Sequence, residues 1–207
     1  MARGKLITIE GIDGAGKSTL ARGLATALGE RGVDVTLLRE PGGVRAAERI
    51  RALVQDPDAR IGSRAETLLY AAARAQLVEE AIEPLLSSGR HVVLDRFVDS
   101  SLAYQGAGRA LGVDAVGAVN DFGTGGLTPD RTLLLELDHR LGRARSHQRG
   151  APLDRLERQS EDFFARVAIG YAELARAHPD RIWTIDASRP PDAVLADAIL
   201  AVEDLVD

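Results

Sequence analysis

A glycine-rich loop, GIDGAGKS at residues 11–18, follows the short β-branched run KLITIE. The loop matches the pattern G-x-x-x-x-G-K-[ST]. In such a loop backbone N–H groups converge on phosphate oxygens, the lysine reaches the β- and γ-phosphates, and the hydroxyl ligates Mg²⁺. The pattern predicts a site for a nucleoside triphosphate, made by Gly11, Ile12, Asp13, Gly14, Ala15, Gly16, Lys17, Ser18 and Thr19. GTPases, ATPases and small-molecule kinases share this loop, so the reaction stays open.

A carboxylate and a guanidinium end the apolar run VVLDRF. Asp95 falls at the carboxyl end of a predicted strand, where open α/β sheets bind their ligands. This carboxylate can hold Mg²⁺ through water. Arg96 follows it and can bind the phosphate of a second nucleotide with two hydrogen bonds. The alternative is a surface Asp-Arg pair in a turn.

Two further segments offer groups for a second ligand. In LLREPGG, Arg39 is a candidate phosphate ligand and Pro41 opens a tight turn, although an ordinary strand-to-helix turn has the same composition. In LLYAAARAQ, Tyr70 and Arg74 are four residues apart and share one face of a predicted helix. A ring beside an arginine can stack on a base and hydrogen-bond its edge. The alternative is a core tyrosine next to a solvated arginine.

An arginine-rich stretch occupies residues 140–159. Gly150 and Pro152 interrupt its helical pattern, which predicts a mobile loop between two helices. We expect a lid at about residues 143–157 that closes on a nucleotide and excludes water; a solvated helix end is the alternative. Its arginines are Arg140, Arg143, Arg145, Arg149, Arg155 and Arg158. The four histidines have no context that suggests metal binding.

Apolar strands that alternate with helical segments position these groups. Strands are expected at residues 5–10, 33–40, 91–95, 131–138 and 181–186. Helices are expected at residues 17–31, 43–54, 64–87, 139–147, 159–178 and 191–206. The strands are continuously apolar rather than alternating, which is typical of a parallel sheet covered on both faces. The sequence therefore predicts a single α/β domain over residues 1–207.

Composition excludes several classes of function. The chain has 207 residues, of which 45% are hydrophobic, so it can bury a substantial core. A net charge of −5 argues against a general nucleic-acid-binding protein. The absence of cysteine excludes disulfides, thiolate metal sites and cysteine nucleophiles. No apolar run is long enough to span a bilayer and no signal peptide is recognisable, so we expect a cytoplasmic protein without a membrane partner.

In their order and spacing these segments resemble bacterial thymidylate kinases. The matching pieces are IEGIDGAGKST, LLREPGG, LLYAAARAQ, VVLDRFVDSSLAYQG, RGAPLDRLERQSEDFFARVAIGYAELA and TIDASRPPDAV. The resemblance implies a P-loop nucleoside monophosphate kinase fold with a five-stranded parallel sheet in the order 2-3-1-4-5. It also implies the reaction ATP + dTMP → ADP + dTDP with Mg²⁺, and a homodimer. Alanine-rich faces of residues 64–87 and 99–120 are candidate contact surfaces.

The resemblance also assigns roles to single residues on the acceptor side. Arg39 and Arg96 would hold the dTMP phosphate, beside Pro41. Tyr70 would stack on thymine, Arg74 would hydrogen-bond its edge, and Tyr104 would crowd the sugar 2′ position. Ser101 and Gln105 would lie near the base.

On the donor side the resemblance implies a charged transfer site. Asp13 would lie near the dTMP sugar and, with Ser18 and Asp95, near the metal. The implied catalytic residues are Lys17, Arg96, Arg149 and Asp13. Arg149 would reach the ATP phosphates from the lid, and Arg143 would pack near the adenine.

Three positions depart from the usual family pattern, and a fourth separates two subclasses. Tyr70 replaces a common phenylalanine, and its hydroxyl needs a polar partner if buried. Val44 replaces a threonine, and Ala73 replaces an aspartate, so we expect Arg74 to lack a carboxylate that orients it. Gly14 replaces an arginine found in one subclass, so the chain resembles the subclass whose catalytic arginine is in the lid. Two alternatives remain: a kinase for another deoxynucleoside monophosphate, and a P-loop protein that uses a nucleotide as a regulatory switch.

Overall fold

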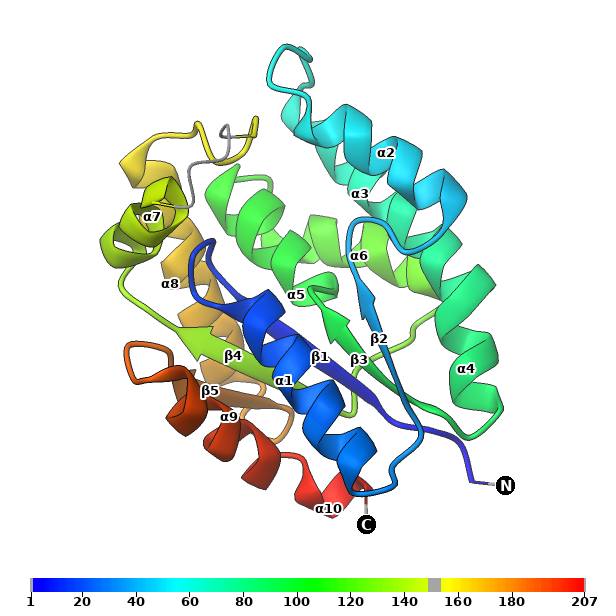
Figure 1. Ribbon diagram of the computed structural model, residues 1–207. Helices are drawn as coiled ribbons and strands as arrows, with labels where there is room; N and C mark the ends of the chain where they lie inside the picture. The colour runs from blue at the N-terminus through cyan, green and yellow to red at the C-terminus, as the bar shows by residue number, and fades with distance from the viewer. Residues whose placement is uncertain (1, 149–153, 207) are drawn as a thin grey trace.

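The computed structural model describes residues 2–148 and 154–206. In these ranges the strands form one parallel sheet with the order β2-β3-β1-β4-β5 (Figure 1), which confirms the predicted architecture. Strands β1, β3 and β4 are largely buried because helices cover both faces of the sheet, whereas the edge strands β2 and β5 are more exposed. The strands are β1 (Leu6–Gly11), β2 (Val35–Arg39), β3 (His91–Asp95), β4 (Arg131–Glu136) and β5 (Ile182–Asp186).

Helices connect the strands and form the outer layers. After β1 comes α1 (Lys17–Glu30), and after β2 come α2 (Arg45–Gln55), α3 (Ser63–Leu77), the π-helical turn η1 (Val78–Ile82) and α4 (Glu83–Ser87). Between β3 and β4 lie α5 (Val98–Ser101), the π-helical segment η2 (Leu102–Gly108) and α6 (Val113–Thr124). The remaining helices are α7 (His139–Gln148), α8 (Glu161–Ala177), α9 (Pro191–Leu200) and α10 (Glu203–Val206).

The hydrophobic core is divided between the two faces of the sheet. On β1, Leu6 packs with residues of α3, η1 and α4, whereas Ile7 and Ile9 belong to the larger cluster that includes α1. Successive side chains of a strand point to opposite faces, so one strand supplies both layers. Helices α1 and α9 pack together on one side, and α8 packs with η2 on the other (Figure 1).

Several element boundaries differ from those expected from the sequence. The helix expected at 64–87 is interrupted by η1, and the one expected at 191–206 breaks after Leu200. Residues 98–124, to which no element boundaries were assigned, form three consecutive helical pieces. Glycines in that segment obscure its helical periodicity, and a buried carboxylate described below caps its start. In the described ranges, no helix is both long and apolar enough to cross a membrane.

Candidate active site

The phosphate-binding loop connects β1 to α1. Gly14 and Gly16 have φ angles of 80° and 96°, which only glycine adopts without strain. The Lys17 ammonium is buried and donates to the carbonyl of Ile12 at 2.7 Å, which folds the side chain back across the loop. Burial lowers the pKa of Lys17 to about 8. An anion in the loop would therefore stabilise the charged form of this lysine.

Helix α7 packs directly against this loop. A Cβ atom added at Gly14 would lie 2.0 Å from the carbonyl oxygen of Gly142, and one added at Gly142 would lie 2.6 Å from the carbonyl oxygen of Asp13. A side chain at position 14 would therefore have to displace α7. This contact gives a physical reason for glycine at position 14. Arg149, assigned as the lid arginine, lies outside the described residues.

The two groups expected to hold a cation meet at the start of α1. The Ser18 hydroxyl donates to the Asp95 carboxylate at 2.6 Å. Hydroxyl and carboxylate oxygens suit Mg²⁺, which usually completes its coordination with waters and substrate phosphates. Among the described residues, no group of three or more His, Cys, Asp or Glu side chains could hold a metal by itself. The pair of oxygens therefore fits a Mg²⁺ ion that arrives with a nucleotide.

Asp13 lies apart from that pair and belongs to a different cluster. Its carboxylate accepts from the Arg96 guanidinium at 2.6 Å and from the Tyr104 hydroxyl at 2.9 Å. The Arg96 guanidinium also lies 5.1 Å from the centre of the Tyr104 ring. The three side chains come from the loop, the end of β3 and η2, and the sheet topology brings them together. Asp13 therefore lies beside Arg96 and Tyr104.

Arg96 has a strained backbone, with a φ of 73°. Its backbone N–H donates to the carbonyl of Ile9, and its guanidinium donates to the carbonyl of Gly11 at 3.2 Å and the hydroxyl of Ser100 at 3.0 Å. These contacts hold the side chain across the end of β1. The turn thus directs a cation over the phosphate-binding loop instead of outward.

A buried carboxylate that the sequence analysis overlooked supports this turn. Glu10 accepts hydrogen bonds from the N–H groups of Phe97 and Ser100 at 2.7 and 3.2 Å, and from the hydroxyls of Ser100 and Tyr171. Burial, reinforced by the nearby carboxylate of Asp99, raises the pKa of Glu10 to about 7. The sequence feature that could have identified Glu10 is its position as a charged residue at the end of a mostly apolar strand.

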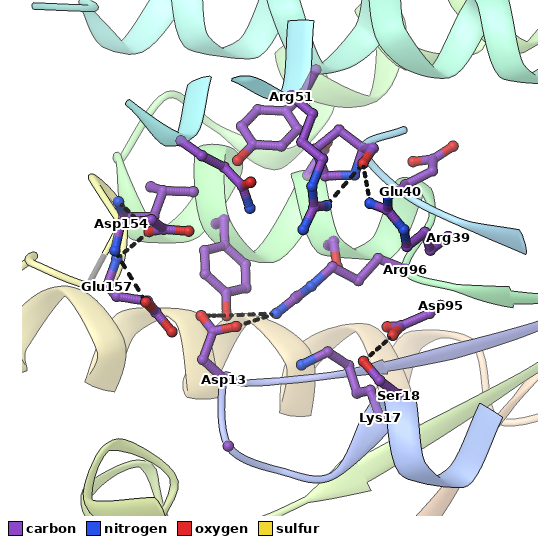
Figure 2. Close-up of a pocket in the computed structure, with 18 of the residues that line it drawn as sticks. Asp13, Lys17, Ser18, Arg39, Glu40, Arg51, Asp95, Arg96, Asp154 and Glu157 are labelled. Atoms are coloured by element: carbon purple, nitrogen blue, oxygen red, sulfur yellow. Dashed lines mark hydrogen bonds and ion pairs between the residues drawn. The ribbon is translucent and has the colours of Figure 1, made fainter. Parts of the chain in front are cut away.

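The segment after β2 supplies further cations to the same space. Arg39 donates to Glu48 at 2.8 Å, and the same carboxylate oxygen accepts from the N–H of Gly43. Arg51 on α2, which the sequence analysis missed, donates to the carbonyl of Pro41 at 2.9 Å. In Figure 2, Lys17 and Ser18 lie at one end of the view, Arg39 and Arg51 at the other, and Arg96 between them. Among basic residues of an amphipathic helix, nothing in the sequence distinguishes Arg51.

Arg74 is 2% exposed, and each of its N–H groups has a protein acceptor. It donates to Glu40 at 2.8 Å, to Ser101 and the carbonyl of Phe97 at 2.9 Å each, and to Asn120. The expectation that Arg74 lacks an orienting carboxylate is therefore wrong, because Glu40 supplies one from the turn after β2. Because Glu40 and Arg74 are 34 residues apart, the sequence alone does not indicate that they interact. Its predicted contact with a base edge stays a prediction.

These groups line one cavity of about 470 Å³. Tyr70, Ser101, Tyr104 and Gln105 also face it. The Tyr70 ring is half-buried, and among the described residues no hydrogen bond to its hydroxyl is present. The other sequence-predicted residues that line the cavity are Asp13, Gly14, Gly16, Lys17, Ser18, Thr19, Arg39, Pro41, Arg74, Asp95 and Arg96.

The structure does not bring Arg143 to this cavity. Its guanidinium lies 5.1 Å from the centre of the Phe164 ring, on α8. Arg145 lines the cavity instead and donates to the carbonyl of Ala187 at 3.0 Å. Two residues along a helix correspond to more than half a turn, so the two arginines point in different directions. Gly11, Ile12 and Ala15 also lie outside the cavity lining.

Comparison with known proteins agrees with this geometry. Residues 9–198 match the family model of thymidylate kinase. The chain is 46% identical to a thymidylate kinase of Deinococcus radiodurans over 204 residues, covering 99% of this chain and 98% of that protein. It is 44% identical to a thymidylate kinase of Geobacillus sp. (strain WCH70), with 99% of each chain covered. The crystal structure of thymidylate kinase from Ehrlichia chaffeensis superposes with a TM-score of 0.81 at 30% identity, covering 97% of this chain and 99% of that one. The chain therefore belongs to the thymidylate kinase family.

Proposed function

We propose that this protein transfers the γ-phosphoryl group of ATP to dTMP, giving ADP and dTDP. The observation that carries this proposal is that one cavity has two groups of cationic side chains that can bind anions. One group is the loop with Lys17, and the other consists of Arg39, Arg51 and Arg96. Family membership supports the same reaction. A regulatory switch needs one phosphate site, whereas phosphoryl transfer between nucleotides needs two.

The acceptor would occupy the part of the cavity between α3, η2 and the turn after β2. Arg39, Arg51 and Arg96 can hold its phosphate, since guanidinium groups match phosphate oxygens with paired hydrogen bonds. Tyr70 can stack on the base. Tyr104, whose hydroxyl is tied to Asp13, would crowd the sugar 2′ position and favour deoxyribose.

The transfer step requires charge neutralisation and positioning more than proton transfer. A phosphate oxygen of dTMP attacks the γ-phosphorus, and the bond from that phosphorus to the bridging oxygen of ADP breaks. The attacking phosphate is already an anion, so no general base is needed. Lys17 and Arg96 would stabilise the charge on the transferred group, and we propose that Arg149 joins them from the lid. Ser18 and Asp95 would hold a Mg²⁺ ion that supplies further positive charge to the phosphates.

A coupled assay that follows ADP release across a panel of nucleoside monophosphates tests the proposal. With ATP we expect turnover of dTMP above that of dUMP, dCMP and the purine nucleotides. Arg96→Met should abolish turnover while ATP binding, measured by calorimetry, is retained. Turnover of dCMP or dUMP without dTMP would favour a different monophosphate kinase. Binding of ATP without turnover of any monophosphate would favour the regulatory alternative.

We also propose that two copies of the chain associate through α3 and α6. These helices pack on each other, and they expose Leu68 (59%) and Phe122 (93%). Large apolar side chains that two neighbouring helices expose are typical of interfaces when they form one patch. Sedimentation should give a dimer for the parent and a monomer for Phe122→Glu. If the parent protein sediments as a monomer even at about 100 μM, where a weak dimer would form, the proposal is contradicted.

A further inference from the structure

Gln105 on η2 lines the cavity, and its amide is held in one orientation by a neighbouring carboxylate. The side chain is 2% exposed, and its Nε2 donates to Oε1 of Glu66 at 2.9 Å. An ionised carboxylate has no proton to donate, so it can only accept hydrogen bonds. The amide nitrogen must therefore face Glu66, and the amide oxygen lies on the other side of the group, where it can accept a hydrogen bond from a ligand. In the described ranges no hydrogen bond to that oxygen is present.

Glu66 on α3 is kept ionised by two arginines. It is 0% exposed and accepts from Arg109 at 3.2 and 2.9 Å, while Arg155 lies 2.6 Å from its second oxygen. Burial opposes ionisation, yet hydrogen bonds from Arg109 and Gln105 and the arginine charges lower the pKa of Glu66. The carboxylate therefore stays an acceptor across the physiological range. The arginines also hold Glu66 rigidly beside the amide.

We propose that Glu66 is a positioning residue that selects the base of the acceptor nucleotide by turning the Gln105 amide oxygen into the cavity. The inference rests on the proposed dTMP kinase activity. Thymine and uracil carry a hydrogen on N3, which an amide oxygen accepts. Cytosine has a lone pair and no hydrogen at N3, so its N3 cannot donate a hydrogen bond to the amide oxygen. A buried polar group left without its partner is costly, so the fixed amide discriminates against cytosine.

The variant Glu66→Gln removes this control with little change of shape. A glutamine at 66 can donate or accept, so the Gln105 amide becomes free to turn over. We expect the ratio of kcat/KM for dTMP to that for dCMP to fall roughly tenfold or more, as for loss of one hydrogen bond to a buried group. The control Arg155→Gln removes another partner of the same carboxylate but leaves the amide fixed. Its ratio should stay within about twofold of the parent, below the change of one hydrogen bond.

A merely structural role of Glu66 predicts a different pattern. In a Gln105→Ala background, Glu66→Gln should no longer change the dTMP-to-dCMP ratio, because the group through which Glu66 acts is gone. If Glu66→Gln lowers the ratio equally with and without Gln105, or leaves it unchanged in the parent background, the proposal is overturned. Turnover of dTMP by the parent separates this result from failure of the proposed function.

Glu66→Gln leaves two buried arginines without their counter-ion, so it could fail to fold. The parent protein then provides the decisive measurement, through a dTMP analogue with carbon and hydrogen in place of N3 and its hydrogen. This 3-deaza analogue should bind roughly tenfold more weakly than dTMP in calorimetry, since the amide oxygen loses its donor. Equal affinity for the two ligands overturns the proposal whatever the variants do. Weaker binding of the analogue supports it.

Discussion

Replacing Glu10 by glutamine should change the pH dependence of stability. This carboxylate is fully buried, and burial together with Asp99 raises its pKa from 4.5 to about 7. The folded protein thus retains a proton that the unfolded chain releases. The stabilisation associated with neutral Glu10 is fully present below about pH 4.5 and is lost as the pH rises through 7. The shift corresponds to a loss of roughly 3 kcal/mol over this range.

Glutamine should remain compatible with the surrounding hydrogen bonds. Its amide oxygen can accept from the N–H groups of Phe97 and Ser100, and its NH₂ group can donate to the hydroxyls of Ser100 and Tyr171, which accept as well as donate. The variant cannot ionise at this position. Glu10→Gln should therefore be more stable than the parent at pH 8.5, and the advantage should shrink towards pH 5.

Urea unfolding followed by circular dichroism at pH 5, 7 and 8.5 measures this difference. The control is Glu173→Gln, which removes one carboxylate from an exposed position on α8 and should leave the pH slope unchanged. We expect the stability difference between Glu10→Gln and the parent to change by about 2.5 kcal/mol between pH 5 and 8.5. Parallel pH profiles for Glu10→Gln and the parent would refute the reasoning, because they would mean that Glu10 ionises equally in the folded and unfolded states.

Further predictions at three positions concern the reaction. Tyr104→Phe loses one hydrogen bond to Asp13 but keeps the ring, so kcat/KM for dTMP should stay within about tenfold of the parent. Tyr104→Ala should gain activity on 5-methyl-UMP, and its absence in the coupled assay would exclude a sugar gate. Arg149→Ala should lower kcat roughly 100-fold, on the scale of losing one arginine finger; an unchanged kcat contradicts the assignment. Gly142→Ala places a Cβ 2.6 Å from the Asp13 carbonyl oxygen and should lower kcat/KM for ATP about tenfold, whereas Gly29→Ala, with open space around its Cβ, should not.

Local sequence patterns were sufficient to predict most of the fold. Continuous apolar strands between amphipathic helices indicate a parallel sheet, because helices must then cover both faces. The glycine-rich loop predicts a nucleotide site, since its backbone conformation needs glycine at particular positions. The strand order rested on the resemblance to a family, and the structure confirms it. The helix boundaries within residues 98–124 could not be predicted, because the start of the first helix depends on Glu10, which is far away in the chain.

The chemistry of individual side chains depended on contacts between distant segments. Arg74 was expected to lack an orienting carboxylate, but Glu40 lies 34 residues away in sequence and 2.8 Å away in space. The sequence did not show whether Arg143 or Arg145 lines the cavity, because the packing of α7 decides this. The sequence by itself determined the fold class and the place of the glycine-rich loop between β1 and α1, since both arise from local periodicity and backbone conformation. Only the tertiary structure decided which atoms of Asp13, Arg74 and Gln105 are already engaged, because hydrogen-bond partners are set by proximity in three dimensions.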